Sequence, residues 1–366
     1  MTEGLHQMHM DDVASNLREL QSLDAPVTRQ LDVWIGTLGF EDRGYAIAEG
    51  LARGNSSSRL ALLCRYDTNQ KDNEAQEERL LAEVDRFAET REWLDADKPV
   101  FPGQLRMHLQ DLQQQLGQAL RIGWDISVAS NQLILSIGQI LLEGDGELEI
   151  FYTEAETYFP TKDEYEADPG RWTGEDRMGL ERGTLNVRTS SAYPGEHSAQ
   201  LANRLLIIPG YNRDRVRKVI SNVDSQFLVE PRPAPITWFV GRPHAPHDAW
   251  REKAVREIHN IPADHEDIPV STFDYREMLL ALERIYAIWG LKSNITLAPM
   301  GSKMQAFGCI LFCFARPDVR VLFAQPEEYN ASRYTKGTRA LWSIEVGRLE
   351  NLTGQLLNVG TLVRLD

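Results

Sequence analysis

Short apolar runs alternate with longer amphipathic stretches along the first half of the chain. The runs have the length and the Val, Ile, Leu and aromatic content that are typical of buried strands, and they cover residues 31–36, 59–66, 124–128 and 147–153. The stretches between them carry apolar residues at three- and four-residue spacing, which predicts helices over residues 43–52, 74–93, 105–120 and 131–142. Strands that alternate with helices favour a parallel sheet covered on both faces, as in a Rossmann-like α/β domain.

The second half of the chain shows the same alternation. Its predicted strands cover residues 204–208, 236–240, 294–298 and 319–323. Its predicted helices cover residues 213–223, 249–259, 275–289 and 303–314. The pattern therefore predicts a second Rossmann-like domain.

A common offset relates the two halves. Three segments recur 171 residues later, namely Gly39-Phe40 as Gly210-Tyr211, residues 125–130 as 296–301, and residues 151–158 as 322–329. A shared period is the mark of an internal repeat. We therefore expect two tandem Rossmann-like domains with mainly parallel sheets, over residues 1–198 and 199–366. Residues 160–198 are polar and lack clear periodicity, and we expect them to form an excursion and a linker.

Charge and composition exclude several functions. The chain has 39 Lys and Arg against 54 Asp and Glu, a net charge of −15, which argues against binding duplex nucleic acid. Its longest strongly apolar run, Met304 to Ala315, is far shorter than the roughly 20 residues of a membrane span. Three cysteines form neither a disulfide framework nor a paired zinc motif. We expect a cytoplasmic protein that binds no membrane, no metal and no cofactor.

A glycine-containing turn follows the first predicted strand of each half. Ligands of open parallel sheets bind where such turns lead into helix N-termini, which favour anions. In the first turn the candidate ligand-binding residues are Gly36, Thr37, Gly39 and Arg43. In the second they are Gly210 and Arg213. The alternative is a pair of tight turns with solvated charges.

A third turn, Pro299-Met300-Gly301-Ser302-Lys303, stands before an apolar helix. Gly301, Ser302 and Lys303 offer a backbone N–H, a hydroxyl and an ammonium group, which suit a phosphate or a carboxylate. The alternative is a Ser N-cap followed by a Lys in solvent. The matching turn in the first half offers Ser130 and Asn131 without a cation, so we expect two sites of similar shape and unequal charge.

These features resemble the CARF family, whose Rossmann-like domains sense cyclic oligonucleotides in prokaryotic immunity. The turn at Gly301, Ser302 and Lys303 is similar to the family's Gly-Gly-Thr-Lys turn, with one Gly and a Ser in place of two Gly and a Thr. Two fused domains resemble the SAVED arrangement of such sensors. The resemblance implies that these three residues contact ligand phosphate. We see no effector domain, so we expect a sensor that acts in antiviral defence with a separate effector protein.

A two-lobed enzyme is the alternative function. Glu41, Asp42, Glu154 and Glu156 are carboxylates near the expected cleft, and two of them could act as acid and base in a nucleoside or NAD glycohydrolase or in a ring nuclease. A glycosyltransferase-like enzyme that uses a sugar nucleotide would also place its active site between two such lobes. His244 and His247 follow a strand and could bind a metal, but no zinc motif accompanies them, and loop histidines in solvent are the commoner explanation. No catalytic residue stands out.

Overall fold

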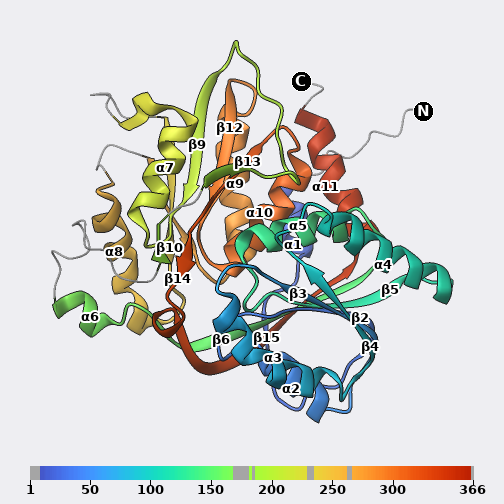
Figure 1. The fold of residues 1–366 in the computed structure, drawn as a ribbon. Coiled ribbons are helices and arrows are strands. Elements are labelled where there is room, and N and C mark those ends of the chain that lie inside the picture. Colours follow the sequence, from blue (N-terminus) through green and yellow to red (C-terminus); the bar gives the residue numbers. More distant parts are fainter. Residues whose placement is uncertain (1–8, 168–180, 184–185, 229–234, 262–265, 364–366) are drawn as a thin grey trace, which may run out of the picture.

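The computed structural model describes residues 9–167, 181–183, 186–228, 235–261 and 266–363. The fold is α/β, with two mixed, mostly parallel sheets that are consistent with Rossmann-like domains. In Figure 1 the second sheet stands beside α7 and α8, and the first sheet lies above α2 and α3. The predicted fold class is confirmed at this level.

The first sheet has seven strands. Their order is β1 (Gln21–Leu23), β15 (Thr335–Arg348), β6 (Gly146–Tyr158), β5 (Leu120–Asp125), β2 (Gln30–Thr37), β3 (Ser57–Arg65) and β4 (Ala88–Asp95). The strands from β6 to β4 are parallel, whereas β15 runs antiparallel to β6 and β1 antiparallel to β15.

The second sheet has six strands. Their order is β11 (Glu266–Ser271), β10 (Ile236–Arg242), β9 (Ala202–Ile208), β12 (Ser293–Pro299), β13 (Arg320–Gln325) and β8 (Asn186–Thr189). All are parallel except β8, which runs antiparallel to β13. The parallel strands of both sheets follow the same order, in which the first strand of each half is central. This order agrees with a tandem arrangement, while the 171-residue repeat stays a prediction.

Helices form three layers around the sheets. The first sheet packs its outer face on α2 (Ala46–Arg53) and α3 (Gln70–Val84), and the second packs its outer face on α7 (Arg213–Val223) and α8 (Trp250–His259). Between the sheets lie α5 (Asn131–Leu142) and α10 (Lys303–Ala315), where Gly138 lies against Ile310. The remaining helices are α1 (Met10–Asn16), α4 (Phe101–Leu116), α6 (Lys162–Ala167), α9 (Tyr275–Trp289) and α11 (Leu349–Val363).

The inner faces of both sheets share one hydrophobic core. This core contains Ile122 and Ile150 of the first sheet, Leu297 of the second sheet, and Ile137 and Ile310 of the two central helices. Because α5 and α10 bury apolar side chains on most of their surface, both read as apolar runs in the sequence. The core fixes the starts of these two helices relative to each other.

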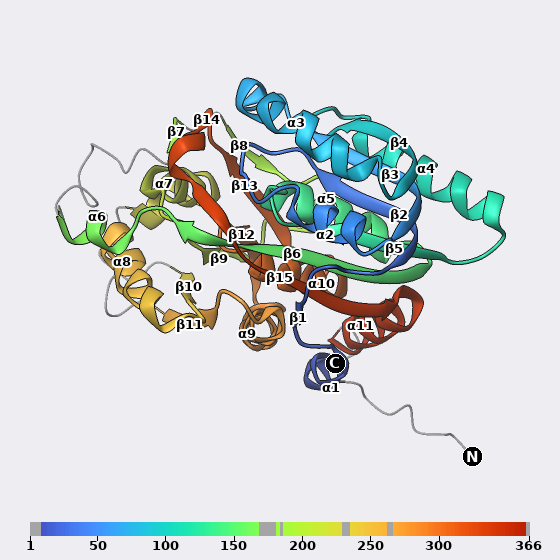
Figure 2. The ribbon, with the colours of Figure 1, turned by 90° about the horizontal axis from the view of Figure 1, so that it is seen from below.

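Each sheet is completed by a strand from the other half of the chain. Strand β15 pairs with nearly the whole length of β6, from Thr335 opposite Tyr158 to Arg348 opposite Glu147. Strand β8, which precedes residue 199, pairs with β13 of the second sheet. Figure 2 shows β15 beside β6, and β1 lies on the other side of β15 at the edge of the first sheet. The division at residue 198 stays a prediction, but two strands cross it.

The structure corrects the predicted helix over residues 74–93. Helix α3 ends at Val84, and residues 88–95 form the edge strand β4. Strand β4 buries Leu94 alone, so its sequence lacks the apolar alternation of a half-buried strand. The structure also shifts the predicted helix 105–120 to 101–116 and the predicted strand 124–128 to 120–125. In the described ranges no helix has the length and apolar character needed to cross a membrane.

Candidate functional site

A cavity of about 810 Å³ lies where the parallel strands of both sheets end. Its wall is formed by the turns after β2, β5, β9 and β12 together with the segment around β14 (Glu328–Tyr329), which pairs with β7 (Glu181–Arg182). Nine of the eleven predicted site residues line it: Gly39, Arg43, Ser130, Asn131, Gly210, Arg213, Gly301, Ser302 and Lys303. The fold therefore brings residues from both halves to one space.

The other two predicted residues, Gly36 and Thr37, do not line this cavity. A Cβ on Gly36 would lie 2.2 Å from Cη2 of Trp34, so this glycine makes room for the buried indole. Thr37 is buried at the end of β2. Both residues belong to the strand itself, and the turn reaches the cavity only at Gly39.

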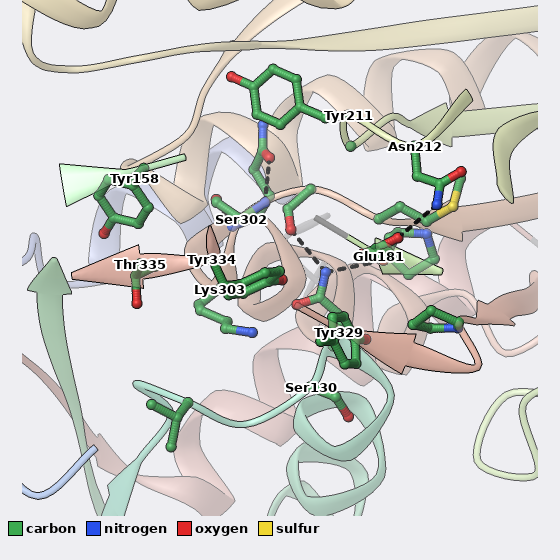
Figure 3. Close-up of a pocket in the computed structure, with 18 of the residues that line it drawn as sticks. Ser130, Tyr158, Glu181, Tyr211, Asn212, Ser302, Lys303, Tyr329, Tyr334 and Thr335 are labelled. Carbon is green, nitrogen blue, oxygen red and sulfur yellow. Dashed lines mark hydrogen bonds between the residues drawn. The ribbon is translucent and has the colours of Figure 1, made fainter. Parts of the chain in front are cut away.

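Ser302 and Lys303 have different roles at the start of α10. Ser302 is the N-cap: its hydroxyl accepts from the Gln305 N–H at 3.1 Å and donates to the Thr272 carbonyl at 2.6 Å. Lys303 does not point into bulk solvent, and Figure 3 shows its amine reaching into the cavity among Ser130, Tyr329 and Thr335. Thus the cap that the sequence allowed is present, and the lysine faces the site.

Lys303 brings an ammonium group without a protein partner among the described residues to the cavity. Its ammonium makes no hydrogen bond and no ion pair with the part of the chain that the structure describes. Burial lowers the pKa of Lys303 to about 8; the charge of Glu41 opposes this shift, while Arg43 and Arg215 reinforce it. A buried amine without a partner carries a desolvation penalty that a bound anion would remove.

Arg43 is fully engaged with protein groups. Its guanidinium contacts a Glu41 carboxylate oxygen at 2.9 Å and donates to the Thr153 carbonyl. Burial disfavours its charge, but Glu41, Tyr158 and Tyr152 together outweigh burial and raise the pKa of Arg43. Glu41 also accepts from the Thr335 hydroxyl at 2.5 Å. Arg43 therefore holds the cavity wall together, and Glu41 neutralises its positive charge.

Arg215 plays the matching role in the second half, which the sequence prediction missed. Its Nε donates to the Ala324 carbonyl at 2.8 Å, and its Nη1 contacts Glu181 at 2.6 Å. Arg215 was visible in the motif as the second arginine after Gly210, but its carboxylate partner lies 34 residues upstream. No local pattern could have found that pairing.

Asn131 joins the two central turns. Its Nδ2 donates to the carbonyls of Gly301 at 2.9 Å and Pro299 at 3.1 Å. Ser130, the N-cap of α5, accepts from the Leu133 N–H at 3.1 Å. The first-half turn therefore supports the backbone that presents Lys303.

Gly210 allows the two turns of the second half to approach closely. A Cβ on Gly210 would lie 2.9 Å from the Met300 carbonyl oxygen, so a larger residue would push the lysine turn away. The Gly210 carbonyl accepts from Nε2 of His259 at 2.7 Å, and burial lowers the pKa of this histidine to about 4. His259 is therefore a neutral support beneath the turn.

Aromatic rings form one wall of the cavity. Phe40 lies 6.0 Å from Tyr329 and 5.6 Å from Tyr334, and the two tyrosine rings lie 5.4 Å apart, all between ring centroids. Tyr66 and Tyr158 also line the cavity. Such rings can stack against a flat ligand group.

The carboxylates of the cavity are held by neighbouring groups. Glu154 lies 3.3 Å from Arg339, 3.2 Å from the indole nitrogen of Trp342 and 3.6 Å from Nε2 of His244. Glu41 and Glu181 are paired with arginines, as described above. His244 stacks on Phe273 with ring centroids 4.1 Å apart. Within the described ranges, no group of three or more His, Cys, Asp or Glu side chains could hold a metal ion.

Comparison with known proteins gave no assignment, because neither a protein-family model nor a curated protein matches the chain.

Proposed function

We propose that this protein is a ligand-sensing module that binds a nucleotide-like anion in the cavity between its two lobes. The observation that carries the proposal is Lys303, a half-buried lysine whose ammonium group faces the cavity and has no protein partner among the described residues. Two neighbouring arginines, Arg43 and Arg215, are neutralised by Glu41 and Glu181, so Lys303 adds a positive charge that these pairs do not offer.

The shape of the site supports this proposal. A volume of about 810 Å³ falls within the roughly 300–1,000 Å³ of small-molecule sites and is too small to hold a duplex. It lies at the carboxyl ends of parallel strands, and α5 and α10 begin at its edge, so their N-terminal dipoles favour negative charge. The aromatic rings of the cavity wall could stack against a nucleotide base.

The likeness of the two halves supports a sensor with pseudo-symmetric lobes. Both sheets order their parallel strands alike, and Arg43 and Arg215, which are 172 residues apart, hold carbonyls that are 171 residues apart, close to the offset of the expected repeat. On the CARF and SAVED resemblance, the ligand would be a cyclic oligonucleotide, and a separate effector protein in prokaryotic defence would read the bound state. Glu41, Glu154 and Glu181 are engaged in ion pairs and hydrogen bonds, which favours this function over the two-lobed enzyme.

A binding screen tests the proposal. Thermal melting and titration calorimetry with AMP, ADP, cyclic dinucleotides, cyclic oligoadenylates and pyrophosphate should give at least one ligand that raises the melting temperature. Saturation at 100 times the dissociation constant would add about 2.7 kcal/mol to the free energy of unfolding. Lys292→Ala is the matched control for Lys303→Ala, because Lys292 is an exposed lysine that precedes β12, at the end of the strand opposite to the cavity. Unchanged melting with every ligand would overturn the proposal.

A further inference from the structure

Asn73, on the inner side of α3, has a side-chain oxygen without a partner. The side chain is only 4% exposed, and its Nδ2 donates to the Thr68 carbonyl at 2.9 Å. Because a carbonyl can only accept, this bond fixes the amide and leaves Oδ1 as the free acceptor. Oδ1 is buried and accepts no hydrogen bond from the described residues. A buried acceptor in this state is costly and calls for a donor.

The surroundings of Asn73 belong to the aromatic wall. Asn73, Thr68, Tyr66, Phe40 and Tyr329 all line the cavity. The neighbouring Asn69 fixes Tyr329 in place, since its Nδ2 donates to the Tyr329 carbonyl at 2.8 Å and its Oδ1 accepts from the Tyr329 N–H at 2.9 Å. The start of α3 and the segment around β14 thus form one wall, built from both halves of the chain.

This wall combines two properties that suit one kind of chemical group. Tyr329 and Phe40 offer ring faces, which bind flat aromatic groups through stacking. Asn73 offers an acceptor, which needs an N–H or O–H donor. Adenine displays an exocyclic amino group at its edge, so an amino-bearing base satisfies both properties at once.

We propose that Asn73 is a specificity-determining residue that selects ligands whose flat heteroaromatic ring carries an amino group. The ring lies against Tyr329, and its amino group donates to Oδ1 of Asn73, while the anionic part of the same ligand lies at Lys303. This inference rests on the proposed function, because it assigns the second end of the ligand in the same cavity. It adds the class of ring that the site accepts and the residue that reads it.

A pair of ligands that differ by one amino group tests this inference. AMP and purine riboside 5′-monophosphate share their phosphate, sugar and ring, and only AMP carries the amino donor. We expect AMP to bind wild-type protein about tenfold more tightly, because the analogue leaves the buried oxygen without a partner. Asn73→Ala should reduce this ratio to about one. Gln132→Ala, which removes an exposed amide at the cavity, should leave the ratio unchanged.

The ratio separates a specificity role from a merely structural one. If Asn73 only supports the start of α3, Asn73→Ala weakens both nucleotides equally and the tenfold preference remains, which overturns the inference. Tyr329→Leu provides a second variant: it should weaken both nucleotides about tenfold and leave pyrophosphate binding unchanged.

Pyrophosphate distinguishes the failure of this inference from the failure of the proposed function. If pyrophosphate binds through Lys303 but wild-type protein binds both nucleotides equally, the base assignment is wrong and the anion site stands. If neither pyrophosphate nor either nucleotide binds wild-type protein, the proposed function and the inference that rests on it are both wrong. Equal affinities would also result if the Asn73 oxygen holds only a water molecule, and they count against the inference.

Discussion

Arg43 and Arg215 make the same contact in the two halves of the protein. Each donates to a backbone carbonyl of the last parallel strand of its sheet, Arg43 to Thr153 on β6 and Arg215 to Ala324 on β13. Each is also paired with a glutamate, but the buried Glu41 comes from the same turn as Arg43, whereas the half-buried Glu181 comes from the segment between the halves. The two arginines therefore brace the cavity and leave the binding of an anion to Lys303.

Replacing Lys303 should separate binding from stability. We expect Lys303→Ala to weaken the binding of a phosphate-bearing ligand by about 10- to 100-fold, because charged hydrogen bonds contribute roughly 1.5–3 kcal/mol. The free energy of unfolding should stay the same or rise, since the substitution removes a buried, unpartnered cation at a helix N-terminus. Calorimetric titration and chemical denaturation measure the two effects.

Two control variants accompany this measurement. Gln132→Ala at the start of α5 removes only a neutral amide and should change affinity less than threefold. Lys292→Ala removes a lysine outside the cavity and should change neither quantity. A Lys303→Ala protein that loses stability and keeps its affinity would show that Lys303 is structural.

Ligand affinity should fall as the pH rises above 8. Burial lowers the pKa of Lys303 to about 8 from its usual 10.5, so the free protein loses this charge between pH 7 and 9. A phosphate monoester is already fully ionised above about pH 7, so its own charge does not change in this range. We expect the affinity for AMP to drop about tenfold between pH 7.5 and 9.5.

The same shift has a defined sign for stability. The unfolded chain keeps the lysine proton up to its usual pKa of 10.5, whereas the folded protein releases it near 8. Between these values the unfolded state binds more protons, so the contribution of Lys303 to stability rises with pH.

Lys303→Arg keeps its charge throughout and should make the affinity for AMP independent of pH over this range. A fall in affinity that persists in Lys303→Arg would assign the effect to another group.

Removing the Arg43 side chain should destabilise the fold. Arg43→Met leaves Glu41 buried without its cation and the Thr153 carbonyl without its donor. Breaking one side of a buried ion pair typically costs about 3–5 kcal/mol. Arg53→Met is the control, because Arg53 pairs with Glu49 on the surface of α2 and such pairs contribute at most about 1 kcal/mol. If both variants lowered the denaturation midpoint by the same amount relative to wild type, this assignment would be contradicted.

Gly36 should prove to be a packing residue. In Gly36→Ala the new methyl group would meet the Trp34 indole, so we expect a loss of about 1–3 kcal/mol in the free energy of unfolding. Gly354→Ala is the matched control, since nothing lies within 4 Å of a Cβ there and alanine favours the helix α11 by up to about 1 kcal/mol. A Gly36→Ala protein as stable as wild type would show that the indole moves aside freely.

The sequence predicted the central elements well and the edges poorly. Helix α9 was predicted over its full length, 275–289, because its apolar side chains follow the helical period and lie against the core. The edge strands β4 and β11 were missed, since their exposed polar side chains carry no strand period and β11 contains Pro269. Strand β15 was also missed, because most of its residues are exposed or half-buried and it therefore lacks the apolar run of a buried strand.

The candidate site was predictable where it follows local rules and hidden where it depends on long-range contacts. Gly210, Gly301 and Lys303 stand in turns between a strand and a helix, and the rule for parallel sheets predicts such turns at one edge. Asn73 stands within a polar helix, and only the fold brings it beside Tyr329, which lies 256 residues later. The residue that we assign to ring specificity therefore had no signal in the sequence.

The pairing of β6 with β15 sets the order in which this protein can mature. Strand β6 ends at residue 158, and its partner begins at residue 335. At roughly 5–20 residues per second, a ribosome needs on the order of ten seconds to bridge that gap. During that interval the newly made β6 exposes an open edge that another nascent chain could join. Translation speed and chaperone supply should thus influence the yield of folded protein.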